Sequence, residues 1–168
     1  MLFSPLLHAQ PKTAVTPAQW QATTLSKVGD WVDWPTNVLG KADQKFVIGI
    51  LGPDPFKGDL GRLTKDTRVR NREVEIRYFG EGDPVVKCHM LFVPTASTGR
   101  FKTLASTLAT NAVLTVGETD DFTKAGGVMC LQYEKIVPKE RMVFNVTNGA
   151  KAGLSPQGRL MKILTAEK

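Results

Sequence analysis

The run FVIGIL at residues 46–51 constrains the fold more than any other segment of the chain. Six consecutive apolar residues, closed by Gly52 and Pro53, are typical of a strand buried on both faces, as in a parallel sheet. Two further apolar runs, at 89–93 and 112–116, predict strands of the same kind. Parallel strands need long crossover connections, so helices are expected between them.

Helical spacing of apolar residues predicts helices at 17–32, 55–66, 99–110, 148–154 and 156–165. Thr16 and Pro17 form an N-cap and first-turn pair at the start of the first helix, and Pro35 excludes its continuation. Alternating residues predict a strand at 74–78, and segments 128–133 and 142–146 are predicted to pair as a hairpin. This order predicts an α/β fold with a mostly parallel or mixed sheet and helices on both faces.

The chain of 168 residues is long enough to bury a conventional core, and it contains no internal repeat. We therefore expect one α/β domain at residues 17–168, preceded at residues 1–16 by a signal-peptide remnant and a linker. The opening segment MLFSPLLHA is short and apolar and ends in Ala9, which favours export. No segment approaches the roughly 20 apolar residues that a membrane-spanning helix needs.

The formal net charge of +6 comes from 22 Lys and Arg against 16 Asp and Glu. The densest group of cations is interleaved with acidic residues, as the positions of Arg68, Arg70, Arg72, Arg77, Asp66, Glu73 and Glu75 show. Nucleic-acid binding needs clustered cations and aromatic rings on which bases stack. The group is therefore interpreted as a solvated strand face, and no nucleic-acid partner is expected.

Candidate catalytic groups are few. His89 is the one histidine outside the N-terminal segment, and its neighbour Cys88 is expected to point to the opposite face of a strand. The two cysteines and His89 lack the spacing of a zinc site, and the loop after FVIGIL lacks a phosphate-binding glycine pattern. We therefore expect no metal, no cofactor and no enzyme activity. A Cys88–Cys130 disulfide is an alternative, but buried free thiols are favoured.

Several segments, taken together and in this order, resemble the YfiR-type family of periplasmic regulators. They are WVDWP at 31–35, FVIGILGPDPF at 46–56, VRNREVEIRYF at 69–79, CHMLFV at 88–93, VLTVGETDDF at 113–122 with Gly126–Gly127, Phe144–Asn145 with Ala152–Gly153–Leu154, and RLMK at 159–162. The matching order extends from about Thr24 to Leu164. The motif residues, which are structural or interface positions, are Trp34, Pro35, Gly52, Cys88, His89, Gly126, Gly127, Asn145, Gly153, Leu154 and Arg159.

The sequence also assigns tasks to individual motif residues. One of Gly126 and Gly127 is expected to take a positive φ, and Asn145 is expected to cap the helix that follows it. This chain differs from some family members, which carry redox-sensitive disulfides. Gly49 stands in the corresponding first strand, no second cysteine accompanies Cys130, and Gln157–Gly158 replaces a Ser-Ser pair.

The resemblance implies a periplasmic, non-enzymatic protein that represses a membrane-bound diguanylate cyclase by contacting its periplasmic domain, and so lowers cyclic-di-GMP signalling and biofilm formation. An outer-membrane lipoprotein that sequesters the repressor and a homodimer are the further partners implied. Candidate interface residues are Trp34, which is alternatively core, and Arg68, Arg70 and Arg72. Two alternatives stay open: a small-ligand sensor that binds a metabolite at the strand ends near Gly52 and Pro94, and an enzyme that uses His89.

Overall fold

The computed structural model describes residues 14–134, 136 and 139–165. The predicted signal remnant at the N-terminus lies outside the described residues, apart from positions 14–16 of its linker. The helices are α1 (Pro17–Val28), α2 (Asp59–Thr64), α3 (Thr98–Leu108), α4 (Asp120–Lys124), α5 (Val146–Lys151) and α6 (Gly158–Thr165), with short 3-10 turns η1 (Gly29–Trp31) and η2 (Thr95–Ser97). The strands are β1 (Val32–Asp33), β2 (Phe46–Leu51), β3 (Arg68–Val69), β4 (Arg72–Phe79), β5 (Met90–Phe92), β6 (Leu114–Gly117), β7 (Met129–Glu134), β8 (Lys139–Phe144) and β9 (Ser155–Pro156).

Seven strands form one mixed sheet in the order β3-β4-β2-β5-β6-β7-β8. The five inner strands run parallel, while β3 and β8 pair antiparallel at the two edges. Every residue of β2 is buried, as its unbroken apolar run predicts. The predicted hairpin is confirmed, because β7 and β8 pair from Met129↔Phe144 to Glu134↔Lys139.

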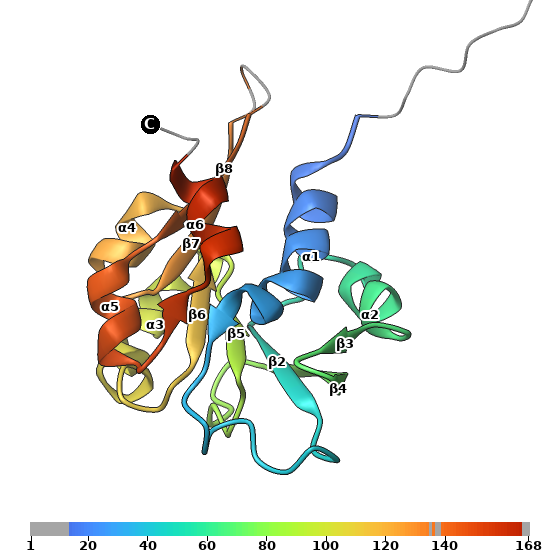
Figure 1. The fold of residues 1–168 in the computed structure, drawn as a ribbon. Coiled ribbons are helices and arrows are strands. Elements are labelled where there is room, and N and C mark those ends of the chain that lie inside the picture. The colour runs from blue at the N-terminus through green and yellow to red at the C-terminus, as the bar shows by residue number, and fades with distance from the viewer. Residues whose placement is uncertain (1–13, 135, 137–138, 166–168) are drawn as a thin grey trace, which may run out of the picture.

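Helices cover both faces of the sheet, which confirms the predicted α/β fold class (Figure 1). On one face, Leu25 of α1, Leu60 of α2 and Leu160 of α6 belong to one buried apolar cluster. On the other face, Phe101 of α3 and Phe122 of α4 belong to a second cluster. The two clusters share the central strand, since Ile48 and Ile50 belong to the first and Val47 and Leu51 to the second.

Two helices are shorter than predicted by four residues or more, and the other three by one or two residues. The helix expected over 17–32 ends at Val28, and a 3-10 turn replaces its last residues. The helix expected from residue 55 begins only at Asp59. The Asp54 carboxylate accepts hydrogen bonds from the backbone N–H groups of Phe56 and Gly58, and Gly58 has a φ of 84°. This local turn competes with helix formation until the chain has passed Gly58.

A two-stranded ribbon joins segments far apart in the sequence. β1 pairs antiparallel with β9, so the WVDWP motif lies against the segment that enters α6. The side-chain amide of Gln157 donates to the Asp33 carboxylate at 2.8 Å, and the Arg159 guanidinium lies 5.3 Å from the centre of the Trp31 ring. The beginning and the end of the domain are therefore held together by specific polar contacts.

The first prediction concerns Gly49 in the middle of β2. A Cβ atom at this position would lie 2.6 Å from a ring carbon of Phe79 and 3.1 Å from a methyl carbon of Leu91. Because both neighbours are buried, Gly49→Val is expected to lower the free energy of unfolding in urea by about 1–3 kcal/mol.

The matched control for Gly49→Val is Gly61→Ala in α2. Beyond its chain neighbours and the backbone of its own helix, a Cβ at Gly61 meets no heavy atom within 4 Å. Since alanine favours the helix over glycine by about 0.5–1 kcal/mol, this variant is expected to be as stable as the parent or more stable. A Gly49→Val protein that unfolds at the parent's urea concentration would contradict the packing argument.

Candidate functional site

A hollow lies at the carboxyl edge of the sheet, beside the two strands from which the chain continues in opposite directions. From β2 the chain passes to β4 on one side, and from β5 it passes to β6 on the other, so β2 and β5 flank the switch point of the sheet. Open α/β sheets bind ligands at the carboxyl ends of the strands at this point. The hollow there, which we name the carboxyl-edge pocket, measures about 510 Å³ and is lined by Gly52, Pro53, Tyr78, Gly80, Glu81, Ala96, Ser97 and Arg100.

Gly52 forms the base of the carboxyl-edge pocket. Its φ of 92° lies in the region that favours glycine, and its N–H donates to the carbonyl of Phe79 at 2.8 Å. A Cβ at this position would lie 2.5 Å from the hydroxyl oxygen of Ser97. The glycine therefore lets Ser97, at the end of η2, approach the main chain that leaves β2.

Arg100 holds one wall of the pocket in place. Its Nη1 donates to the carbonyls of Phe79 and Gly80 at 3.1 and 2.7 Å, and its Nη2 donates to the carbonyl of Asp83. All three acceptors are neutral. Among the salt bridges of the described residues, none involves Arg100, so its charge has no carboxylate partner there.

Tyr78 supplies the aromatic surface of the pocket. Its side chain is 49% exposed, and its hydroxyl lies 3.5 Å from a carboxylate oxygen of Asp54. Partial burial, followed by the Asp54 charge and the hydrogen bond to it, raises the pKa of Tyr78 above 10.0. The phenol is therefore neutral at physiological pH and presents a flat uncharged ring.

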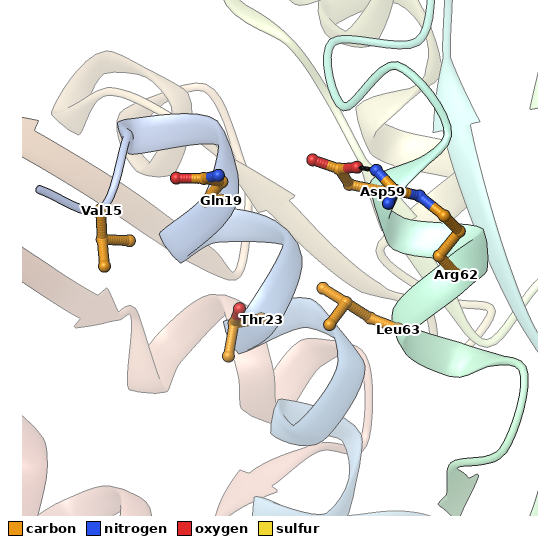
Figure 2. A pocket seen from close by; sticks show the side chains of 6 residues that line it. All are labelled: Val15, Gln19, Thr23, Asp59, Arg62 and Leu63. Carbon is orange, nitrogen blue, oxygen red and sulfur yellow. Dashed lines mark hydrogen bonds and ion pairs between the residues drawn. The ribbon is translucent and has the colours of Figure 1, made fainter. Parts of the chain in front are cut away.

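A second hollow, which we name the α1–α2 groove, lies between the first two helices. It measures about 560 Å³ and is lined by Val15, Gln19, Thr23, Asp59, Arg62 and Leu63. Figure 2 shows that Leu63 projects from α2 toward α1, while Gln19 and Thr23 follow one another along α1 and Val15 lies in the segment before that helix. Val15 and Leu63 are 53% and 42% exposed, and Arg62 pairs with Asp59 at the rim. The groove therefore combines two exposed apolar side chains with polar and charged ones.

His89 is a core residue. Its ring stacks on Phe46 with centroids 4.9 Å apart, and the edge of Trp34 lies against it at 6.4 Å. The backbone N–H of Val47 donates to Nδ1 at 2.9 Å, so the neutral ring carries its proton on Nε2. Burial and then the charge of Lys87 lower the pKa of His89 below 6.5, against a hydrogen bond with the backbone of Val38.

Both cysteines are buried, and no disulfide joins them. Burial raises the pKa of Cys88 to about 12, although the charge of Arg77 opposes the shift. A thiol that stays protonated at neutral pH is a poor nucleophile. Cys88 is thus unsuited to pair with His89 in the way a cysteine enzyme requires.

The four candidate interface residues lie in different environments. Trp34 is 8% exposed, and its indole N–H donates to the carbonyl of Gly29 at 2.9 Å, so it lies in the core. The Arg72 guanidinium donates to the carbonyls of Leu39, Arg70 and Gly40 and is committed to the fold. The backbone N–H of Arg70 donates to the Asp30 carboxylate, and Arg70 has a φ of 52° in the β3–β4 turn. Arg68 is exposed and lies 3.7 Å from the Glu73 carboxylate.

The remaining motif residues shape turns and helix ends. Gly126 has a φ of 103°, as expected for one of the glycine pair, and Gly127 is packed against the Phe122 ring. The side chain of Asn145 accepts from the N–H of Asn148 at 2.9 Å and caps α5, also as expected. Gly153 has a φ of 73° after α5 and packs near Pro35, and Leu154 is buried.

Sequence reasoning placed a ligand site near Gly52 and Pro94 but did not single out Tyr78, Ser97 or Arg100. These residues come from the end of β4, from η2 and from α3. One signal was available, because residues that follow directly after predicted parallel strands gather at the carboxyl edge. The order of the strands, which decides which loops meet, was not readable from the sequence.

The second prediction concerns the pH dependence of His89. Since its pKa is lower in the folded than in the unfolded protein, the folded state takes up fewer protons, and stability is lost as the pH falls through 6.5. His89→Asn keeps an acceptor for Val47 but cannot titrate. The variant is expected to be about 2 kcal/mol less stable at pH about 8, because ring contacts are lost.

The measurement is urea unfolding of both proteins at several values between pH about 8 and pH about 5. The difference in stability between parent and variant is expected to shrink as the pH falls. Only the parent has a histidine here, and its protonation in the unfolded state favours unfolding. A gap that stays constant across this range would show that His89 carries no depressed pKa.

Two further features are absent from the described residues. No group of three or more His, Cys, Asp and Glu side chains among them is arranged to hold a metal ion. No helix within the same residues has both the length and the apolar character needed to cross a bilayer.

Comparison with known proteins assigns the chain to a family. None of the curated proteins compared with it matches. The sequence profile described as YfiR/HmsC-like matches residues 18–163, which span α1 to α6 and all nine strands. This range contains the WVDWP, CHMLFV and RLMK segments on which the resemblance rested. The chain belongs to the YfiR/HmsC-like family.

Proposed function

We propose that this chain is an exported, non-enzymatic regulator that represses a membrane-bound diguanylate cyclase by direct contact with that enzyme's periplasmic domain. The observation that carries the proposal is the family match over residues 18–163, since the family consists of periplasmic regulators of cyclic-di-GMP signalling. An outer-membrane lipoprotein that sequesters the regulator, and a homodimer, are part of the same proposal. Lower cyclic-di-GMP and reduced biofilm formation are its expected consequences.

A regulator of this kind needs no catalytic group. It must bind one state of its target more tightly than the other, and its effect is limited by that difference in affinity. The geometry of Cys88 and His89 supports this view, because the thiol is protonated and the imidazole is committed to the core. Function then depends on which surface meets the partner.

The α1–α2 groove is the surface that we propose for this contact. Interfaces combine a few apolar anchors at their centre with a polar rim. Leu63 and Val15 supply exposed apolar side chains, and Arg62, Asp59 and Gln19 border them (Figure 2). Arg68, the exposed cation among the interface candidates, follows α2 after a short turn, at the start of β3.

The third prediction tests the function and the surface together. Deleting the gene is expected to raise intracellular cyclic-di-GMP, and supplying the intact gene is expected to restore it. The Leu63→Arg variant is expected to fail in restoration, because an unpaired charge in an apolar contact weakens binding by at least about tenfold. The measurement is cyclic-di-GMP in cell extracts, with the level of exported protein verified.

Val146→Arg is the matched control. Val146 is 60% exposed at the start of α5, on a different helix pair, so the charge it gains lies away from the groove. This variant should restore repression like the parent. Unchanged cyclic-di-GMP after gene deletion would refute the proposed function, whereas full repression by Leu63→Arg would refute the groove alone.

A further inference from the structure

The carboxyl-edge pocket has the size and the position of a ligand site. Its volume of about 510 Å³ lies within the range of roughly 300–1,000 Å³ typical of small-molecule pockets. It is built from three separate loops that converge at the switch point of the sheet, where the strands' carboxyl ends meet. The α1–α2 groove, by contrast, is lined by residues of two helices and by Val15, which precedes α1.

The charge on the pocket wall indicates what the ligand carries. Arg100 is half-buried and makes its three hydrogen bonds to neutral carbonyls, so its positive charge is not balanced by them. The three bonds fix the guanidinium while leaving part of its five-donor fork uncommitted. A fixed guanidinium with free donors favours a carboxylate, which accepts short, charge-assisted hydrogen bonds.

The carboxylates beside the residues that line the pocket restrict the ligand further. The Asp83 carboxylate accepts from the N–H of Gly80, and the Asp54 carboxylate accepts from backbone N–H groups and lies next to Tyr78. Glu81 is exposed on the pocket rim. Because Glu81 repels additional negative charge, one carboxylate suits the pocket better than several.

The uncharged surfaces indicate the rest of the ligand. The Tyr78 ring and Pro53 present flat apolar faces, and Gly52 leaves the main chain open to close approach. The Ser97 hydroxyl makes no hydrogen bond with the described residues and lies directly over Gly52. A flat body against Tyr78, with its carboxylate toward Arg100 and Ser97, uses every one of these groups.

From this arrangement we propose that the carboxyl-edge pocket binds a small monocarboxylate with a flat apolar body. Arg100 and Ser97 hold the carboxylate, and Tyr78 and Pro53 contact the flat part. This binding site is separate from the α1–α2 groove and does not depend on the proposed repression of a diguanylate cyclase.

The test is a titration of the full chain, labelled with nitrogen-15, with benzoate as the probe. Saturable shifts are expected in the backbone amide signals of Gly52, Gly80 and Ser97. Acetate, which lacks the ring, and benzyl alcohol, which lacks the charge, are each expected to bind at least about tenfold more weakly. Absent saturation with benzoate, equal binding of the three probes, or saturable shifts at Leu63 instead would overturn the proposal.

Variants distinguish binding in this pocket from a general electrostatic attraction of benzoate to the protein. Ser97→Ala removes one hydroxyl without touching the loop contacts and is expected to weaken benzoate binding about fivefold. Arg100→Gln should weaken it at least about tenfold. Lys102→Gln, on the exposed side of the same helix, removes the same charge and should bind like the parent. Equal weakening by Lys102→Gln and Arg100→Gln would mean that the net charge, not this pocket, attracts the probe.

Discussion

The complete burial of β2 is the constraint on which the rest of the structure depends. A strand without a solvent-facing side chain must have a neighbour on each edge and a helical layer on each face. In this chain β4 and β5 occupy the edges, and α1 and α3 contribute to opposite faces. Gly49 permits this crowding, because a side chain there would collide with Phe79. The loops that follow β4, β2 and β5 lie side by side at the carboxyl edge because of these pairings.

The sequence predicts the elements whose signal is local. The apolar run of β2 and the cap at Asn145 are both found, because each depends on residues within one turn or one strand. The ribbon of β1 and β9 was not predicted, since strands of two residues carry no periodic pattern. The start of α2 was misplaced because the hydrogen bonds of Asp54 compete with the helix, and apolar spacing does not register them.

The candidate site shows the same division between local and distant information. Its position at the end of β2 was predictable from Gly52 and the fold class. Its chemistry was not, because Tyr78 and Arg100 meet only through the order β4-β2-β5. The structure does not support Trp34 and Arg72 as interface residues, for a related reason. Arg72 looks like a surface cation in sequence, but distant carbonyls at Leu39 and Gly40 hold it in the fold.

The two proposed sites share one segment of the chain. Residues 52–58 begin at the base of the carboxyl-edge pocket and end at the first turn of α2, which borders the α1–α2 groove. Asp54 lies midway: it accepts from Phe56 and Gly58, which set the start of α2, and its carboxylate lies beside the Tyr78 hydroxyl. The Tyr78 hydroxyl and the start of α2 thus have one neighbour in common, the Asp54 carboxylate. If binding at the two sites is linked, the coupling must be equal in both directions, so a partner in the groove alters ligand affinity as much as the ligand alters the partner's.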